Sequence, residues 1–183
     1  MLTLILGGAR SGKSKLAQRL AASAGRVAYI ATAVVDDEPE MAARIARHRG
    51  DRPHSWQTVE EPLALASAVE CASKNVDTVL VDCLTIWLSN LSWEHRDSPP
   101  RELEALTHRE IERIAAVARQ CHVILVSNEL GSGTVPEAAV TRAFRDVHGI
   151  VNQSAAEIAD EVILTVAGLP LYLKTASRRE ETF

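Results

Sequence analysis

Short, continuous apolar runs recur along the chain and are separated by longer segments with a different periodicity. Within each run successive residues are hydrophobic, rather than every second residue. This pattern is typical of parallel strands whose two faces are both covered. We therefore predict strands at Leu2–Leu6, Val27–Ala31, Thr78–Val81, His122–Ser127 and Val162–Val166.

The longer segments place apolar residues three or four positions apart, which indicates helices with one buried face. The polar stretch Ser92–Pro100 is predicted to be an exposed connection. Alternating strands and helices predict βαβ units, and hence an α/β fold with a doubly wound, mostly parallel sheet. The predicted helices are Ser14–Ala24, Glu38–Arg49, Pro62–Lys74, Arg101–Gln120 and Pro136–Asp160, the last with Gly149 as a candidate break.

A hairpin and a tail complete the predicted organisation. Leu171–Lys174 is expected to pair with Val162–Val166 through a turn at Gly168 and Pro170. With 183 residues and no internal repeat, the chain is predicted to form one domain over residues 1–174. The polar residues 175–183 are expected to form a flexible, frayed tail.

Composition and charge narrow the class of function. Hydrophobic residues make up 46% of the chain, enough to bury a core without disulfides or a structural metal. A net charge of −4 gives no support for binding to nucleic acid or to acidic membranes. No apolar run approaches the ~20 residues of a membrane span. The chain opens directly on a predicted strand, without the basic leader of a signal peptide.

The three cysteines, Cys71, Cys83 and Cys121, form no disulfide framework and no C-x-x-C pair. We expect them to be small buried hydrophobes. A reduced, cytoplasmic protein is the simplest account of them.

One motif carries specific chemistry. The segment from Gly7 to Ser14 fits G-x-x-x-x-G-K-[ST], and it follows a predicted strand and opens a predicted helix. Glycines let backbone N–H groups curl around phosphate oxygens, and the helix N-terminus adds partial positive charge. Lys13 is predicted to reach the β and γ phosphates, and the Ser14 hydroxyl to bind Mg²⁺. The phosphate loop comprises Gly7, Gly8, Ala9, Arg10, Ser11, Gly12, Lys13 and Ser14.

A protein with such a loop also needs an acid at the end of a nearby strand to hold magnesium. Asp82 ends the apolar run from Val79, and we expect it beside the phosphate loop if the sheet is doubly wound. The alternative is that Asp82 caps a following helix at Thr85–Leu91. Glu129 is a second candidate acid. Since no guanine-reading N-K-x-D motif occurs, these patterns favour a small nucleotide-dependent kinase or a related transferase.

A second cluster places one histidine, His48, among arginines. The cations Arg44, Arg47, Arg49 and Arg52 would keep its imidazole neutral and nucleophilic, and would offset charge on a phosphate under attack. The alternative, a solvated basic helix end, is favoured by the spacing alone. The remaining histidines lack metal-ligand spacing and a paired acid and are expected at the surface or in the core: His54, His95, His108, His122 and His148.

The motifs together resemble one enzyme family. Residues 7–14 match its phosphate loop almost letter for letter, Tyr29–Ala33 follows at the expected distance, and Glu40–Ile45 leads into His48. The chain is therefore identified as similar to the bifunctional adenosylcobinamide kinase and adenosylcobinamide-phosphate guanylyltransferase of cobalamin biosynthesis. Further matching positions are Arg52, Pro53, Trp56, Thr58–Glu60, Asn128, Glu129, Gly131, Gly133, Val135, Pro136, Phe144–Asp146 and Val151–Gln153.

This resemblance implies two reactions. A nucleoside triphosphate, ATP or GTP, phosphorylates the hydroxyl of the aminopropanol arm of adenosylcobinamide in the presence of Mg²⁺. A histidine, which matches His48, then takes GMP from GTP and passes it to adenosylcobinamide phosphate. The resemblance also implies a homotrimer with the active site between subunits. Arg47 stands where many members carry a second histidine. Besides residues 7–14, the implied nucleotide contacts are Thr32, Ala33, Val34, Arg49, Gly50, Asp51, Arg52, Glu60 and Asp82.

Two other classes of function stay open on the residues themselves. One is a P-loop kinase of another small alcohol, in which His48 is incidental. The other is a nonenzymatic, nucleotide-dependent switch or assembly protein. Labelling of the chain by GTP that carries a labelled α-phosphate would support the bifunctional enzyme only.

Overall fold

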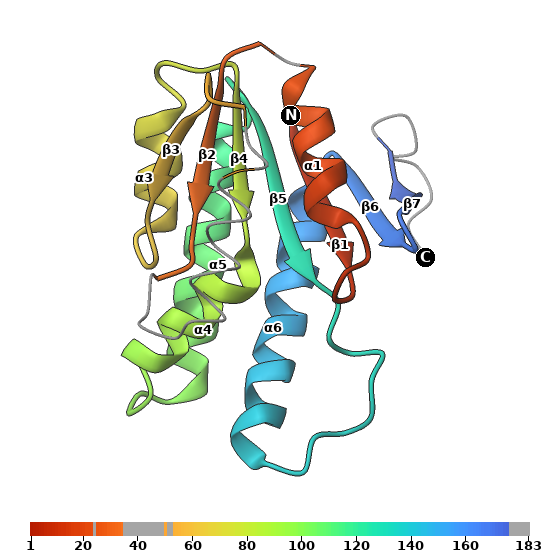
Figure 1. Cartoon of the computed structure of the whole chain (residues 1–183). Helices are drawn as coiled ribbons and strands as arrows, with labels where there is room; N and C mark the ends of the chain where they lie inside the picture. The colour runs from red at the N-terminus through yellow and green to blue at the C-terminus, as the bar shows by residue number, and fades with distance from the viewer. Residues whose placement is uncertain (24, 35–49, 51–52, 176–183) are drawn as a thin grey trace.

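A seven-stranded sheet runs through the molecule and carries helices on both faces (Figure 1). The computed structural model describes residues 1–23, 25–34, 50 and 53–175. The strand order is β3-β2-β4-β5-β1-β6-β7, and all neighbours are parallel except β6 and β7. The strands are β1 (Leu2–Gly7), β2 (Val27–Ala31), β3 (Gln57–Glu60), β4 (Thr78–Asp82), β5 (His122–Asn128), β6 (Glu161–Val166) and β7 (Leu169–Lys174).

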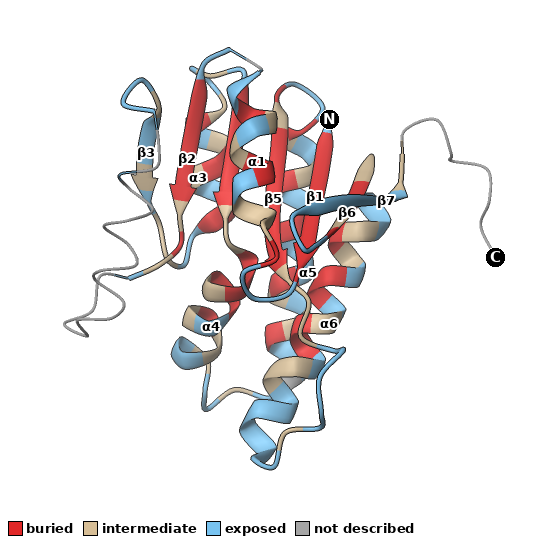
Figure 2. Ribbon diagram, turned by 45° about the vertical axis from the view of Figure 1, so that its right-hand side comes forward, coloured by how far each residue is buried: buried red, intermediate tan, exposed pale blue. Residues whose placement is uncertain are grey.

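The described helices divide unequally between the two faces. In Figure 1, α1 lies in front of the sheet, α3, α5 and α6 lie behind it, and α4 lies below the ends of the strands. Successive residues of β1 belong to two separate core clusters: Leu4 packs with the larger helix layer and Ile5 packs with α1. Both faces are thus buried, as Figure 2 shows, which confirms the doubly wound α/β prediction. The helices are α1 (Lys13–Ala22), α3 (Leu65–Ala72), α4 (Leu84–Glu94), α5 (Pro100–Val117) and α6 (Ala139–Ile158).

The edge strand β3 was not predicted from the sequence. It is four residues long and mostly exposed, and only Val59 is partly buried. Its backbone pairs in parallel with β2, from Ala28 opposite Gln57 to Ala31 opposite Glu60. An edge strand needs backbone hydrogen bonds on one side only, so it can form without an apolar run.

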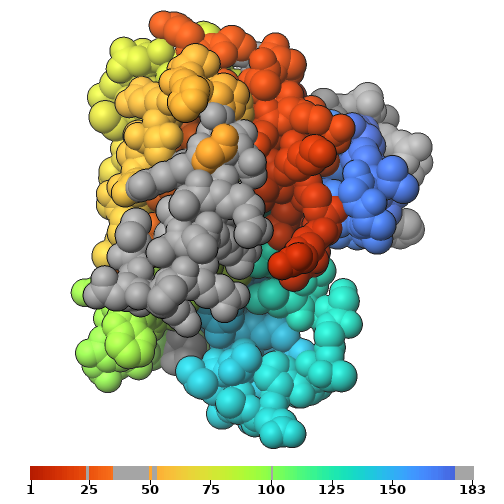
Figure 3. All heavy atoms as spheres, viewed as in Figure 1, coloured from red at the N-terminus to blue at the C-terminus, as the bar shows by residue number. Residues whose placement is uncertain are grey.

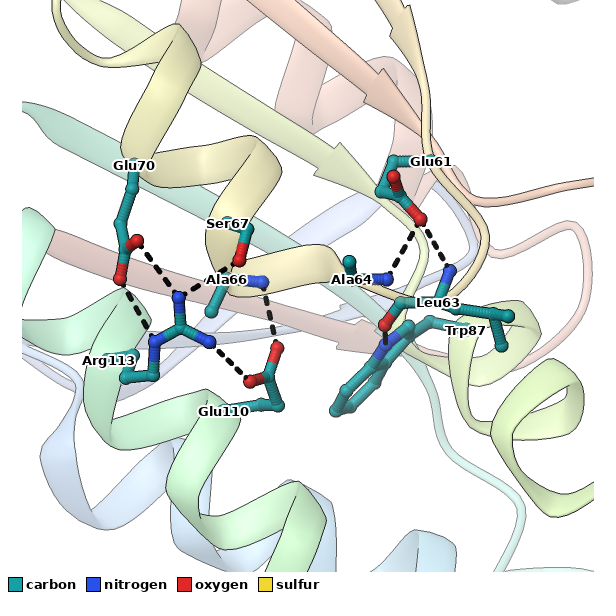
Figure 4. Close-up of polar contacts among 9 residues, drawn as sticks. All are labelled: Glu61, Leu63, Ala64, Ala66, Ser67, Glu70, Trp87, Glu110 and Arg113. Atoms are coloured by element: carbon teal, nitrogen blue, oxygen red, sulfur yellow. Dashed lines mark hydrogen bonds and ion pairs between the residues drawn. The ribbon is translucent and has the colours of Figure 1, made fainter. Parts of the chain in front are cut away.

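The helix predicted from Pro62 begins only at Leu65, because tertiary contacts decide its start. Glu61 Oε1 accepts the N–H groups of Leu63 and Ala64 at 2.9 and 2.8 Å. The N–H of Ala66 donates to Glu110 Oε2 on α5 at 3.0 Å (Figure 4). The N–H groups at the start of α3 are therefore satisfied by one local carboxylate, Glu61, and one distant carboxylate, Glu110, neither of which hydrophobic spacing reveals.

Three further boundaries differ from the sequence predictions. Helix α4 continues to Glu94, so the connection predicted from Ser92 starts inside a helix. Helix α6 begins at Ala139 and runs without a break through Gly149; the candidate break is therefore wrong. A single glycine lowers helix stability by only about 1 kcal/mol, which the buried face of α6 can offset.

The predicted hairpin is confirmed, with a tighter turn than expected. Strands β6 and β7 are antiparallel, and the turn consists of Ala167 and Gly168, both with positive φ. Pro170 lies within β7 opposite Thr165. A proline is tolerated there because β7 is an edge strand.

The cysteines follow the prediction only in part. All three are free, but only Cys121 is buried, and Cys71 is exposed. In the described parts of the chain, no helix has both the length and the apolar character needed to cross a membrane. The predicted helix Glu38–Arg49 and tail residues 176–183 lie outside the described residues.

Candidate functional site

The phosphate loop connects β1 to α1 at the carboxyl edge of the sheet. The N–H of Ser11 donates to the Gly8 carbonyl oxygen at 3.2 Å, and Lys13 Nζ donates to the same oxygen at 3.2 Å. Gly12 is the N-cap of α1, has φ of 96° and carries no side-chain cap. The first amides of α1 therefore lack the side-chain acceptor that usually occupies a helix N-terminus, which suits an anionic ligand.

Two glycines of the loop are required by close packing. A Cβ on Gly7 would lie 2.7 Å from the carbonyl oxygen of Thr165, and it would also meet Ser11 Oγ. A Cβ on Gly12 would lie 3.1 Å from Gly168 Cα. The N–H of Gly168 donates to the Ser11 carbonyl oxygen at 2.8 Å. The turn of the β6–β7 hairpin thus packs against the phosphate loop and stabilises it. No local sequence motif predicts this contact.

Two buried hydroxyls lie close to Gly7 of the phosphate loop. Among the residues that the structure describes, Ser11 Oγ and Thr165 Oγ1 are buried and have no hydrogen-bond partner. Buried polar groups in native proteins are nearly always paired, with protein, water or ligand. Ser11 and Thr165 both lie next to Gly7 in space. Their hydroxyls are therefore placed where they could bind a phosphate oxygen or a water molecule at the phosphate site.

Asp82 ends β4 and is oriented by a buried tyrosine. Tyr29 Oη donates to Asp82 Oδ2 at 2.8 Å. Asp82 does not cap the next helix, because Cys83 is the N-cap of α4 and no side-chain cap bond is made there. The strand of Asp82 is not a direct neighbour of the phosphate-loop strand, since β5 lies between β1 and β4.

Despite the intervening strand, the charges of Asp82 and Lys13 both influence the Cys83 thiol. Desolvation of the partly buried Cys83 thiol and, to a smaller extent, the charge of Asp82 raise its pKa to about 11, while the charge of Lys13 opposes the shift. Both functional groups therefore lie close enough to Cys83 to influence its ionisation. The thiol itself stays protonated at neutral pH and is no nucleophile.

Thr32 joins the ends of β2 and β4. Its hydroxyl donates to the Cys83 carbonyl oxygen at 2.8 Å and accepts the Cys83 N–H at 2.9 Å. The Asp82–Cys83 peptide bond is cis. The Thr32 side chain is fully buried, so its hydroxyl serves the fold, whereas Val34 is exposed. Strand register sets Ala31 opposite both Asp82 and Glu60, so these side chains end their strands at one level.

A buried polar network holds the end of β5, next to the phosphate loop. Thr85 Oγ1 lies 3.0 Å from His148 Nε2 and accepts the N–H of Asn128 at 2.9 Å. Asn152 donates to the Asn128 carbonyl oxygen at 3.0 Å and accepts from Ser127 Oγ at 2.7 Å. The network fixes the strand end that leads directly into Glu129.

Glu129 adjoins the loop more directly than Asp82 does. Its N–H donates to the Gly7 carbonyl oxygen at 3.0 Å. Its carboxylate accepts the N–H of Gly131 at 2.5 Å, so in this structure the side chain is turned into its own loop. The sequence offered the strand-end position as a signal for Glu129 and the family-matching stretch Val151–Gln153 for Asn152, but it offered no signal for His148.

Burial of His148 depresses its pKa, and the charge of Glu129 opposes that shift. Burial and the charge of the N-terminal ammonium also lower the pKa of His122. Its Nε2 lies 3.0 Å from Thr3 Oγ1. His108 contradicts the expectation of no paired acid, because its Nε2 lies 3.4 Å from Glu112 Oε1.

The predicted nucleophile lies outside the described residues, as do its flanking arginines. Gly50 is described and exposed. The phosphate loop, Asp82, Glu60 and the 32–34 segment all lie at or just after the carboxyl ends of parallel strands, but three strands separate β3, which ends at Glu60, from β1. The predicted positions that fall outside are Arg44, Arg47, His48, Arg49, Asp51 and Arg52.

The donor types at this edge fit magnesium. Ser14 and Asp82 offer hydroxyl and carboxylate oxygens, the ligands that Mg²⁺ prefers. Within the described ranges, no group of three or more His, Cys, Asp or Glu residues could hold a metal ion. Mg²⁺ bound with a nucleotide usually takes only one or two protein ligands, with phosphates and water completing its shell.

Comparison with known proteins places nearly the whole chain among relatives of one family. Residues 3–173 match the family described as cobinamide kinase / cobinamide phosphate guanyltransferase. The chain is 49% identical over 178 residues to the bifunctional adenosylcobalamin biosynthesis protein CobP of Pseudomonas aeruginosa, covering 95% of this chain and 98% of that protein. It is 40% identical over 182 residues to CobU of Escherichia coli, covering 95% and 100%.

The fold comparison reaches a more distant protein. An ATPase from the type III secretion system of pathogenic bacteria superposes with a TM-score of 0.55 at 13% identity, over 93% of this chain and 56% of that one. At this identity the likeness concerns the fold alone, and it agrees with the predicted α/β fold with a doubly wound, mostly parallel sheet.

Proposed function

The chain belongs to the cobinamide kinase / cobinamide phosphate guanyltransferase family, and we propose that it carries out both reactions at the carboxyl edge of its sheet. The observation that carries this proposal is the phosphate loop itself. Its helix N-terminus has no side-chain cap, and Lys13 lies within reach of the loop carbonyl of Gly8. The substrates are adenosylcobinamide and a nucleoside triphosphate, ATP or GTP.

In the first reaction, the hydroxyl of the aminopropanol arm attacks the γ-phosphorus, the bond from that phosphorus to the β–γ bridging oxygen breaks, and the nucleoside diphosphate leaves. The proton of the hydroxyl passes to water. Lys13 neutralises charge on the β and γ phosphates, and backbone N–H groups of the loop that are not used within it hold the phosphate oxygens. Phosphoryl transfer depends mainly on positioning and charge stabilisation, and these groups supply both.

Magnesium would be held by the hydroxyl of Ser14 and the carboxylate of Asp82. When bound, it withdraws charge from the phosphates during transfer. Tyr29 fixes one Asp82 oxygen through its 2.8 Å hydrogen bond, so the carboxylate keeps one orientation. Thr32 positions the same strand end through Cys83.

In the second reaction, an imidazole nitrogen of His48 attacks the α-phosphorus of GTP and pyrophosphate leaves. A phosphate oxygen of adenosylcobinamide phosphate then attacks the same phosphorus, the P–N bond breaks, and His48 is restored. The product is adenosylcobinamide-GDP. The arginines at 44, 47, 49 and 52 keep the imidazole neutral and offset phosphate charge. Ala33, Val34, Glu60 and residues 49–52 complete the nucleotide contacts in this proposal.

The assembly that we propose is a homotrimer in the cytoplasm. Strand β7 lies at the sheet edge and exposes Leu169, Leu171, Tyr172 and Leu173 (Figure 2). A long apolar edge strand is usually covered by a partner, which supports an oligomer. The free cysteines agree with a reducing compartment. Sedimentation of the purified chain at micromolar concentration tests the trimer.

The test of the double function uses GTP labelled at the α-phosphate. The purified chain is incubated with this GTP and Mg²⁺ and separated under denaturing conditions. We expect acid-labile, base-stable label on the chain, and a separate assay should show phosphorylation of adenosylcobinamide. A chain that phosphorylates adenosylcobinamide but takes no label would be a kinase only.

A further inference from the structure

A large cavity opens at the carboxyl edge of the sheet and is separate from the phosphate loop. Its volume is about 990 Å³, at the upper end of the range for small-molecule sites. It lies between the end of α4 and the beginning of α6, and in Figure 3 these two segments, green and cyan, both reach the surface at the bottom of the molecule. We call it the α4–α6 cavity.

The walls of the cavity are apolar and unusually open to solvent. Trp93, Val140 and Val34 line it and are 72%, 77% and 53% exposed, with Phe144 and the buried Val147 behind them. Single exposed apolar residues are common, but several around one cavity mark a binding site. Arg96 stacks on Trp93, its guanidinium carbon 5.3 Å from the ring centroid, so this aromatic face is held flat against a cation.

The cavity is joined to the nucleotide site by specific contacts. Val34 belongs to its wall and also to the predicted nucleotide segment. Asn90, another lining residue, donates to the carbonyl oxygens of Thr32 and Pro62 at 2.8 and 3.1 Å. The wall residue Leu63 is fixed because its carbonyl oxygen accepts Trp87 Nε1–H at 2.9 Å (Figure 4). The cavity is therefore built onto the same rigid elements as the site.

The position of the cavity sets the shape of a ligand that would use both places. Trp93 lies nine residues along α4 from Leu84, so about 14 Å of helix separates it from the strand end at Asp82. A nucleotide on the phosphate loop leaves this distance to be spanned by the second substrate. Cobinamide fits this requirement, since it is a flat macrocycle with apolar surface, amide groups around its rim and one long arm that ends in the reacting hydroxyl.

We propose that the α4–α6 cavity binds the corrin macrocycle of the cobinamide substrate. The inference rests on the proposed function for the identity of the ligand. Trp93 and Phe144 cover the apolar surface of the ring, while Ser89, Asn90 and His95 face its amide arms. The aminopropanol arm extends along α4 toward Asp82 and the γ-phosphate.

The test separates binding of the corrinoid from chemistry on the nucleotide. Trp93→Ala and Val140→Arg should each raise the KM for adenosylcobinamide at least tenfold in the kinase assay. The KM for the nucleoside triphosphate, and the labelling of the chain by GTP alone, should stay within twofold of the parent. Trp93→Phe should restore most of the affinity, because it keeps a flat apolar ring. Ile158→Arg is the matched control, since it introduces arginine on the same helix at its far end.

Direct binding distinguishes failure of this inference from failure of the proposed function. Equilibrium dialysis of adenosylcobinamide without nucleotide should show binding by the parent and by Ile158→Arg, and loss with Val140→Arg. If the parent binds the corrinoid but never phosphorylates it, the proposed kinase is wrong while the cavity assignment stands. If both cavity variants keep the parental affinity and KM, the inference is wrong. It is also wrong if Val140→Arg dissociates the free protein into smaller species, because the cavity is then an interface between copies.

Discussion

Among the described residues, Asp82 carries the proposed magnesium-binding carboxylate. One of its oxygens is held by Tyr29, which is buried and comes from the neighbouring strand β2. A metal-binding carboxylate must present its oxygens in one orientation, and a partner behind it supplies that constraint. Substitution of Asp82 should therefore impair magnesium binding strongly, and substitution of Tyr29 should impair it more mildly.

Asp82→Asn should fold normally and lose most Mg²⁺-dependent activity in both half-reactions. Tyr29→Phe should lower kcat about tenfold to a hundredfold, as loss of a hydrogen bond to a charged group costs roughly 1.5–3 kcal/mol, and should raise the Mg²⁺ concentration needed for half-maximal rate. Both are measured by titrating Mg²⁺ at saturating nucleotide. Unchanged Mg²⁺ dependence in Asp82→Asn would move the role to another acid, with Glu129 next.

His148 gives a prediction about stability and pH. Its native pKa lies below the ordinary value near 6.5 because the ring is buried. The unfolded chain therefore binds the proton more readily, so the stability held above pH 6.5 is lost as the pH falls through the native pKa. We expect the free energy of unfolding to fall below pH 6.5 less steeply in His148→Gln than in the parent. Urea denaturation at several pH values measures this, and the exposed His54→Gln should keep the parental slope.

At the scale of elements, the long helix α6 holds the buried network against the end of β5. Val147, Val151 and Ala155 bury its inner face, and this packing carries the helix past Gly149 although a glycine lowers its propensity. The hairpin of β6 and β7 acts in a similar way on the phosphate loop, through Gly168 and Ser11. Elements distant from the motif thus shape it.

Gly149→Ala should stabilise the protein without changing its activity. Apart from its chain neighbours and the backbone of its own helix, a Cβ at this position meets no atom within 4 Å. Alanine lowers the conformational entropy of the unfolded chain and so stabilises the folded protein by about 0.4–1 kcal/mol. Thermal or urea unfolding measures the gain. The matched control, Gly7→Ala, should instead destroy nucleotide binding, because its Cβ would collide with the Thr165 carbonyl oxygen. A destabilised Gly149→Ala would show that the helix is strained there.

At the scale of the molecule, one sheet edge serves two proposed reactions with different nucleophiles. A substrate hydroxyl attacks in the kinase step, whereas His48 attacks in the guanylyl step. The phosphate loop, Asp82 and the α4–α6 cavity all lie at this edge. The two chemistries can therefore share the nucleotide and corrinoid sites and still be separated by substitution.

His48→Asn should abolish the guanylyl-enzyme and the transferase reaction and keep measurable kinase activity. Lys13→Ala is the reciprocal variant: it should abolish the kinase and weaken triphosphate binding, because the transition state loses charge at the β and γ phosphates. Both half-reactions and α-label on the chain are measured for each variant. A labelled His48→Asn would transfer the role to another histidine, with His54 nearest. Loss of both reactions in a folded His48→Asn would show that His48 positions nucleotide for both steps.

The sequence by itself determined the phosphate loop, five of the seven strands almost residue by residue, and the doubly wound class. These features are local. The loop needs only consecutive glycines, Lys13 and Ser14 between a strand and a helix, and a strand buried on both faces must be apolar at every position. The resemblance in motifs along the chain was likewise sufficient to name the family that the comparisons confirm.

Only the tertiary structure decided the strand order, which sets β5 and not β4 beside the phosphate loop. It also decided three contacts between distant parts of the chain. These are the hydrogen bond between Tyr29 and Asp82, which are 53 residues apart, the hydrogen bond from Gly168 to Ser11, and the packing that forms the cavity between α4 and α6. The physical reason is common to all of them. Each joins residues distant in the chain, and periodicity reports which face of an element is buried but not which element covers it.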